Sequence, residues 1–264
     1  MLFRSMGQTW TGKVLDINDK KALAYVNIGV VGKSLGTVSD ENGCFEIDLP
    51  ELEAKDSLRF SICGYQAVSY SVLDLKNKFP KGIMEIQLKE KIIQIPEVTI
   101  RGKVKEEILG NKSGNKGISG GFTSNQLGCE VGVRINIEKS PTYIRNFNFQ
   151  IVKNVFDTLF FRVNIYNLKD GFPYQNILPY PIYYTTVASN GLISIDLTPY
   201  HIVVEEDFFI SLEWVKNFSK KELKNGLFFT MRVGGSTTFY RHASQDEWKK
   251  LSPVSLRFNT LAKF

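Results

Sequence analysis

Histidine and cysteine are scarce in this sequence of 264 residues, which contains two histidines and three cysteines. The cysteines, Cys44, Cys63 and Cys129, have no CxxC spacing, and this excludes both a zinc ribbon and a disulfide framework. Because their number is odd, at least one thiol stays free. Cys44 and Cys63 lie in strand-like runs, where we expect them to act as small buried hydrophobic residues. We predict no disulfide between the two halves of the chain.

Long apolar runs are also lacking. No stretch approaches the roughly 20 apolar residues that span a bilayer, and the sequence has no apolar core of a signal peptide. We therefore predict no transmembrane segment. Residues 1–7 match no structural pattern, and we interpret them as the remnant of a leader.

Charge of one sign is in small excess. The 33 Lys and Arg residues exceed the 27 Asp and Glu residues, which gives a formal net charge of +6, and both signs are interspersed along the chain. A clustered basic stripe, the usual mark of nucleic-acid binding, is missing. The hydrophobic content of 43% and the charged content of 23% are typical of a globular protein and exclude collagen-like and wholly disordered chains.

Motifs for catalysis are equally scarce. The sequence has no GxSxG motif, and the glycines of residues 110–121 lack the GK[ST] ending of a phosphate-binding loop. Residues 241–246 contain Arg, His, Ser and Asp, but a catalytic triad is assembled from distant segments, so we expect a polar turn there. Paired carboxylates such as Asp196 and Glu205 keep a glycan hydrolase open as an alternative. We predict no catalytic residues, no metal site and no cofactor.

Short strands with turns between them characterise the first hundred residues. Turn residues separate strand-like runs about ten residues apart, which is the pattern of an all-β sandwich. The sharpest turn is Asp40 to Gly43, because its Asn-Gly pair tolerates the positive φ of a tight hairpin. The predicted strands are residues 8–15, 24–31, 44–49, 57–63, 67–72 and 83–88.

A change of composition divides the chain. Residues 101–118 are rich in Lys, Gly, Asn and Ser, and they resemble a linker. Only eight of the 33 aromatic residues precede residue 119, so we expect two separate cores. The second segment predicts a jelly-roll-like β-sandwich, with a helical signal only at 219–225. Its predicted strands are residues 130–137, 144–152, 158–166, 182–187, 192–197, 207–215, 227–233 and 236–241.

Residues 8–90 resemble the carboxypeptidase-regulatory-like domain, a transthyretin-like β-sandwich found at the N-terminus of TonB-dependent outer-membrane receptors. The residues that carry the resemblance are 12–16, 24–28, 36–40, Gly43, Phe45, Ser61, Gly64 and Tyr65. Residues 95–102 also resemble the segment that follows this domain in such receptors. The complete prediction is an all-β chain with a leader remnant at 1–7, the regulatory-like sandwich at 8–100, a linker at 101–118 and a jelly-roll-like sandwich at 119–264.

The resemblance implies an accessory domain without its enzyme. A metallocarboxypeptidase binds zinc through two histidines and a glutamate, two of them at HxxE spacing. Here His201 precedes Glu205 and Glu206, and His242 precedes Asp246 and Glu247, and neither set has that spacing. The remaining sequence is also too short for the plug and barrel of a receptor. The family implies the periplasm, the outer membrane or secretion from a Gram-negative bacterium.

Aromatic side chains give the one positive indication of a ligand. Rings exposed at the loops of a jelly roll can stack on sugar faces, and an arginine can supply directed hydrogen bonds. The candidates are Tyr174, Tyr180, Tyr240, Arg241 and Trp248. Alternatively, these rings fill the ends of an aromatic-rich sandwich.

Our hypothesis is a non-catalytic binding or structural protein of the cell envelope. The N-terminal sandwich acts as a spacer or docking domain, and the C-terminal sandwich binds a glycan or an envelope protein. The alternative is a glycan-active hydrolase that uses carboxylates of the C-terminal domain. A cytoplasmic protein is a third possibility.

Overall fold

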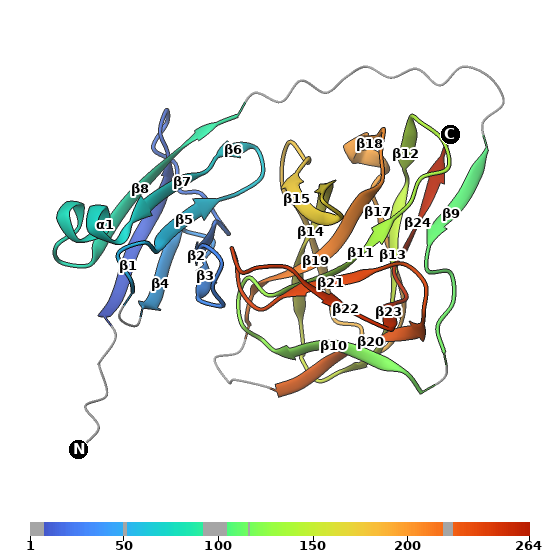
Figure 1. Cartoon of the computed structure of the whole chain (residues 1–264). Coiled ribbons are helices and arrows are strands. Elements are labelled where there is room, and N and C mark those ends of the chain that lie inside the picture. The colour runs from blue at the N-terminus through green and yellow to red at the C-terminus, as the bar shows by residue number, and fades with distance from the viewer. Residues whose placement is uncertain (1–7, 50–51, 92–104, 116, 219–223) are drawn as a thin grey trace. The chain divides into compact units, whose positions relative to one another are not determined.

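The computed structural model describes residues 8–49, 52–91, 105–115, 117–218 and 224–264 (Figure 1). The chain divides into two compact units. Unit 1 contains Met1–Ile93 with two short segments, Gln126–Cys129 and Arg241–Glu247. Unit 2 contains Gln94–Asn125, Glu130–Tyr240 and Trp248–Phe264. The predicted leader remnant and the segment that resembles the region after the N-terminal domain lie outside the described residues.

Unit 1 is built from two four-stranded sheets. The first has the order β4 (Cys44–Leu49), β1 (Gln8–Asp16), β8 (Ile83–Glu90) and β6 (Tyr65–Gln66), with β1 and β8 parallel. The second has the order β3 (Gly36–Val38), β2 (Asn27–Val30), β5 (Ser57–Ser61) and β7 (Val68–Ser71). The predicted N-terminal sandwich is confirmed.

Alternation of side chains builds the core of unit 1. Trp10 and Val14 of β1 are buried with Phe45 of β4, and Ile28 and Phe60 of the second sheet belong to the same apolar cluster. Gly12 is required between them, since a Cβ atom at this position would lie 2.3 Å from the Met84 carbonyl oxygen and 2.7 Å from the Phe45 ring. The glycine therefore lets β1 approach β8 closely.

Three details of unit 1 differ from the expectations. The turn Asp40 to Gly43, which has Gly43 at φ 73°, connects β3 to β4 in the other sheet and is not a hairpin. Cys44 is exposed, because the buried residues of β4 are Phe45, Ile47 and Leu49 on the opposite face. An unexpected helix, α1 (Val72–Lys78), follows β7, and the Ser71–Asp74 capping box closes its N-terminus. None of the three cysteines forms a disulfide in the part of the chain that the structure describes.

Unit 2 contains a nine-stranded and a seven-stranded sheet, both with antiparallel pairing. The first comprises β10 (Ser119–Ser124), β20 (Lys224–Val233), β13 (Asn146–Asn154), β24 (Asn259–Lys263), β12 (Thr142–Ile144) and β18 (Val203–Val204), joined by β17 (Gly191–Asp196), β23 (Val254–Leu256) and β9 (Glu106–Gly110). The second comprises β15 (Phe172–Asn176), β14 (Leu159–Lys169), β19 (Phe208–Lys216), β11 (Glu130–Ile135), β21 (Thr238–Arg241) and β22 (Lys249–Leu251), joined by β16 (Ile182–Thr186).

An aromatic core lies inside unit 2. Phe122 of β10 packs against Phe161, Trp214 and Phe229, with ring centroids 5.9, 5.4 and 6.0 Å away. These rings come from both sheets, and all four side chains are buried. The all-β, sandwich-like architecture of the C-terminal part is confirmed. Within the described ranges no helix is long and apolar enough to cross a membrane. The predicted helical signal at 219–225 lies outside the described residues up to 223, and β20 begins at Lys224.

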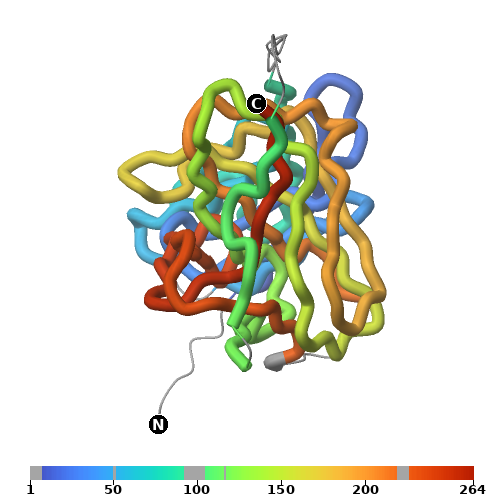
Figure 2. The backbone as a smooth tube through the Cα atoms, turned by 90° about the vertical axis from the view of Figure 1, so that its right-hand side faces the viewer, coloured from blue at the N-terminus to red at the C-terminus, as the bar shows by residue number. Residues whose placement is uncertain are grey.

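Part of the range predicted as a linker is a strand. Residues Glu106–Gly110 form β9, which pairs antiparallel with β24 in the register Gly110 to Asn259 and Glu106 to Lys263. Figure 2 shows β9 in green beside β24 in dark red. Leu109 is buried, which anchors the strand. The Lys- and Glu-rich composition concealed this strand, because it begins with two consecutive glutamates, Glu106 and Glu107, and Leu109 is its only buried residue.

Candidate functional site

Tyr180 is the predicted ligand residue with the clearest surroundings. It lies between β15 and β16, its side chain is 42% exposed, and its ring centroid is 5.9 Å from that of Tyr200. Tyr200 ends a 3-10 turn, Thr198–Tyr200, that precedes β18. Figure 1 shows β15 and β18 at the same end of unit 2. The two tyrosines therefore form a partly exposed ring pair that the sequence did not reveal, because 20 residues separate them.

A pocket of about 320 Å³ opens beside the segments that carry this ring pair. Ile177, three residues before Tyr180, and Val203, three residues after Tyr200, line the pocket, whereas the two tyrosines themselves do not. The pocket is lined by Asn167, Ile177, Val203, Val204, Glu205, Glu206, Asp207 and Phe208. Apolar walls with a few polar groups are typical of small-ligand sites, and the volume reaches the lower end of their range.

The carboxylates of the pocket differ in their partners. Asp207 forms an ion pair with Arg134 at 2.7 Å and accepts a hydrogen bond from the Ile137 amide at 2.9 Å. Glu205 and Glu206 are exposed, and neither forms an ion pair with any residue that the structure describes. Asp207 thus fixes the start of β19, whereas the two glutamates are available to a ligand.

Asp196, the other carboxylate that the sequence singled out, has a local structural role. Its Oδ1 atom accepts hydrogen bonds from the backbone amide of Thr198 at 2.9 Å and from the Thr198 hydroxyl at 2.7 Å. These bonds, the backbone one first, lower the pKa of Asp196. The Asp196 side chain therefore holds Thr198, the first residue of the 3-10 turn that ends at Tyr200.

Tyr174 stands alone among the predicted residues. It lies on β15 with its side chain 53% exposed, and the Lys169 ammonium lies 5.0 Å from its ring centroid. It is not among the pocket residues. Its exposed ring lies against Lys169, whereas the Tyr180 ring lies against Tyr200, and this makes Tyr174 a natural comparison for Tyr180.

Trp248 belongs to a ring cluster on the seven-stranded sheet. Its ring centroid is 5.8 Å from Tyr166 and 5.0 Å from Phe209. Phe239 completes the cluster at 5.9 Å from Phe209, and Phe172 lies 5.2 Å from Phe239. The rings of Phe172 and Trp248, from two distant segments of the chain, are therefore connected through Phe239 and Phe209. These rings pack against one another and do not form an open ligand site. Trp248 fits the alternative interpretation, in which such rings fill the end of the sandwich.

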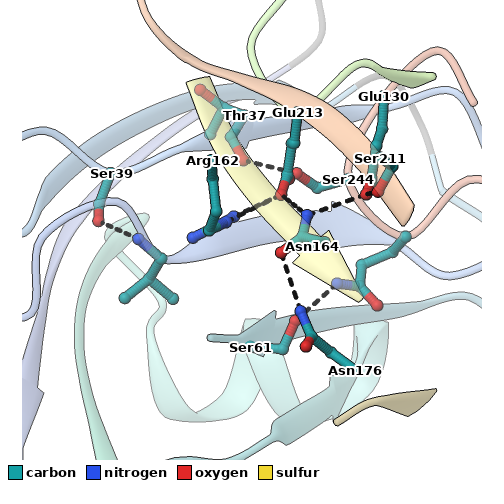
Figure 3. A network of polar contacts seen from close by, with 12 residues as sticks. Thr37, Ser39, Ser61, Glu130, Arg162, Asn164, Asn176, Ser211, Glu213 and Ser244 are labelled. Carbon is teal, nitrogen blue, oxygen red and sulfur yellow. Dashed lines mark hydrogen bonds and ion pairs between the residues drawn. The ribbon is translucent and has the colours of Figure 1, made fainter. Parts of the chain in front are cut away.

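A buried polar network lies beside this cluster, on the face of the sheet that does not contain the aromatic core (Figure 3). Glu213 Oε2 accepts hydrogen bonds from Arg162 Nε at 2.9 Å and from Asn164 Nδ2 at 2.7 Å, and Arg162 Nη2 lies 2.8 Å away. Asn164 Nδ2 also lies 2.9 Å from Glu130 Oε1, which the Ser211 hydroxyl contacts as well. The cross-strand register Arg162–Glu213–Glu130 brings these groups together.

The network is inaccessible in this structure. Glu130 and Glu213 are fully buried, and Arg162 and Asn164 are each 1% exposed. Glu213 Oε1 is buried and has no hydrogen-bond partner. The sequence analysis did not predict these residues. Their only signal in the sequence is a polar side chain at every second position of two strongly apolar strands, Arg162 and Asn164 on β14 and Ser211 and Glu213 on β19. No group of three or more potential metal-ligating residues occurs among the described side chains.

Tyr240 and Arg241 do not join the pocket either. Tyr240 is half-buried on β21, and Arg241 is buried and begins the segment that belongs to unit 1. That segment is the predicted polar turn: the Asp246 amide donates to the Ala243 carbonyl at 3.2 Å, and Asp246 Oδ2 accepts from the Ser34 hydroxyl at 2.7 Å. None of the five predicted ligand residues lines this pocket, and Tyr180 lies three residues along the chain from Ile177, which does.

The family of the N-terminal part follows from its sandwich and from a family model. The model, described as the CarboxypepD_reg-like domain, matches residues 10–100. Residues 10–100 form a CarboxypepD_reg-like domain. The match ends there, so the greater part of unit 2 lies outside the CarboxypepD_reg-like domain.

Comparisons with other proteins add distant similarities only. No curated protein matches the chain. The cysteine protease and lectin-like domains of Cwp84, a surface layer associated protein of Clostridium difficile, are similar at 8% identity with a TM-score of 0.38, covering 98% of this chain and 59% of that one. The VP2 subviral particle of infectious bursal disease virus is similar at 10% identity with a TM-score of 0.28, covering 91% and 60%. The chain thus spans less than two thirds of either structure.

Proposed function

We propose that the protein is a non-catalytic binding protein of the bacterial cell envelope, in which unit 2 binds a glycan at the Tyr180 pocket. The CarboxypepD_reg-like domain acts as a spacer or docking domain. The periplasm, the outer-membrane surface and the exterior are the compartments in keeping with the resemblance to outer-membrane receptor domains. A protein partner in the envelope and a glycan hydrolase are the alternatives, and the experiment below distinguishes the hydrolase.

The observation that carries the proposal is the partly exposed ring pair of Tyr180 and Tyr200, each of which is three residues along the chain from a residue that lines the pocket. Pyranose rings present an apolar face of C–H groups that stacks on an aromatic ring, while their hydroxyls need hydrogen-bond partners. Glu205 and Glu206 supply free acceptors for such hydroxyls. Ile177, Val203 and Phe208 supply an apolar wall.

The test is binding of the full chain to a glycan array, followed by titration calorimetry with the best oligosaccharide. Tyr180→Ala removes the stacking surface, and we expect it to weaken binding about tenfold, because a lost aromatic contact of about 1–1.5 kcal/mol corresponds to that factor. Tyr174→Ala is the matched control, since this ring of the same unit is 53% exposed and lies against Lys169, outside the Tyr180–Tyr200 ring pair; it leaves affinity unchanged.

Two results would contradict the proposal. Equal losses of affinity for Tyr174→Ala and Tyr180→Ala would mean that the glycan also contacts β15, outside the Tyr180–Tyr200 ring pair. Turnover of a glycan that vanishes with a single Asp or Glu substitution would establish the hydrolase instead.

A further inference from the structure

The strand β17 lies at an edge of the nine-stranded sheet. An edge strand can pair with a strand of another chain, because the backbone amides and carbonyls on its outer side have no ladder partner. β17 pairs with β13 in an unbroken register over Gly191–Asp196, and β13 is its only partner strand in the part of the chain that the structure describes. The strand is six residues long and contains neither proline nor lysine.

Several other terminal strands of unit 2 carry features that hinder such pairing. Pro173 interrupts β15, Lys249 and Lys250 begin β22, β18 has only two residues, and β10 has a register shift against β20. Natural proteins protect their sheet edges by these means. β16 has no such feature, but its one exposed residue is Thr185. β17 combines an unprotected edge with Leu192, an aliphatic side chain that is 62% exposed.

The hydrogen bond that follows β17 shows which of its residues point outward. The Leu197 amide donates to the Arg145 carbonyl at 2.9 Å, so Leu197 points toward β13. Successive residues of a strand direct their amide and carbonyl groups to opposite sides. Leu192, Ser194 and Asp196 therefore direct these groups away from β13. The side chains of the same three residues are exposed, so the outer edge of β17 faces solvent.

We propose that β17 pairs antiparallel with β17 of a second copy of the chain, about a two-fold axis at Ser194. In this register Ser194 faces Ser194 of the second copy and Leu192 faces its Asp196, so the outward groups of both strands form hydrogen bonds. The half-buried Ile193 contacts Ile195 of the second copy on the inner face.

Charge and symmetry favour a second copy in the antiparallel direction. Asp196 is the only charged residue of β17. An antiparallel pair places the two Asp196 carboxylates at opposite ends of the ladder, whereas a parallel pair would place these like charges side by side. The two-fold axis also closes the assembly, because neither copy retains an open β17 edge. This inference does not depend on the ligand of the Tyr180 pocket.

Sedimentation velocity of the full chain over a wide range of concentrations tests the proposal. We expect a dimer fraction that rises with concentration. Ser194→Pro removes an amide that the pairing with β13 does not use, and the loss of the central hydrogen bonds should weaken the dimer at least about tenfold. Ser194→Lys places two positive charges directly opposite each other and should also dissociate the dimer. Ser194→Ala, the matched control, keeps the amide and retains the dimer.

Disulfide cross-linking tests the register, in a Cys44→Ser background because Cys44 is exposed. Directly opposed residues of a hydrogen-bonded pair have Cα atoms about 5.5 Å apart, a distance that a disulfide spans. Ser194→Cys should therefore cross-link two copies under mild oxidation. Leu192→Cys, also exposed, should not, because Leu192 faces Asp196 of the second copy.

Each contrary result overturns the proposal. A chain that stays monomeric at every concentration has no such interface. A dimer that persists in both Ser194→Pro and Ser194→Lys uses another surface. Equal cross-linking of Ser194→Cys and Leu192→Cys would mean random collision instead of a fixed register. Far-UV circular dichroism verifies that the variants fold, and if Ser194→Pro unfolds, Ser194→Lys decides the outcome.

Discussion

The Arg162–Glu213 ion pair allows a quantitative test of whether water is excluded from the polar network of unit 2. The side chains are 2% and 0% exposed, and the charged atoms lie 2.8 Å apart. At an effective dielectric constant of about 20 the attraction is about 6 kcal/mol. Desolvation costs several kcal/mol for each ion, so the intact pair contributes little net stability. Removing one partner is different, because it leaves a buried charge uncompensated.

Arg162→Met should therefore lower the free energy of unfolding by about 3–5 kcal/mol. The double variant Arg162→Met with Glu213→Leu should recover most of this loss, since it removes both charges and fills the space with apolar groups. The assay is urea unfolding followed by tryptophan fluorescence in a Trp10→Phe background, so that the signal comes from Trp214 and Trp248 of unit 2. Comparison of the singles with the double variant isolates the coupling energy.

A loss below about 1 kcal/mol for Arg162→Met would refute the reasoning, because it would mean that water or another cation solvates Glu213. A double variant no more stable than Arg162→Met would refute it as well. Glu213 Oε1 has no hydrogen-bond partner among the described residues, so a small loss for Arg162→Met would indicate that water or a cation reaches this atom.

Three further predictions concern other parts of the molecule. Asn111→Ala removes the hydrogen bonds that the Asn111 side chain makes with the buried Ser255 hydroxyl, the Leu256 carbonyl and the half-buried Ser236 amide, and it should lower the free energy of unfolding by about 2–4 kcal/mol in the same urea assay. Burial, and then the hydrogen bond to Asp16, raise the pKa of Tyr65 to about 12. The stability that this phenol contributes is complete below its unfolded pKa of about 10 and is lost as pH rises through about 12. The loss is on the order of 1–2 kcal/mol after allowance for the partial exposure of Tyr65. Tyr65→Phe should abolish this decrease in urea titrations across that pH range. Cys44 should react with a maleimide within minutes in the native protein and Cys129 only after unfolding, as mass spectrometry of the labelled peptides can establish; equal rates would contradict the burial of Cys129.

Much of the sandwich architecture could be predicted from alternation alone. Phe45, Ile47 and Leu49 alternate with polar residues, and this alternation predicts Cys44 on the exposed face. The usual burial of cysteine predicts the opposite, and the alternation is the correct guide. The helix α1 was also readable, because Ser71 and Asp74 have capping-box spacing and Val72 and Leu75 are one helical turn apart. These are local signals, and they depend on nearest neighbours in the sequence.

The sites were less predictable because they depend on contacts between distant segments. Alternation assigns Arg162 and Asn164 to one face of β14, but it gives no indication that this face is buried. The pocket combines Asn167 and Ile177 with residues 203–208, and no spacing rule connects these segments. The sequence predicts Tyr180 as an exposed ring in a loop between two strands, but it gives no indication that Tyr200 lies beside it.

The pairing of β9 with β24 has a consequence for the order in which the chain can fold during synthesis. The ladder joins Gly110 to Asn259, so β9 leaves the ribosome about 150 residues before its partner is made. At 5–20 residues per second, this leaves roughly 7–30 s in which β9 lacks the strand that it pairs with. An unpaired strand with exposed backbone groups is a template for association with other chains. The charged residues Lys105, Glu106 and Glu107 around its start therefore oppose aggregation of the nascent chain as well as solvating the finished sheet.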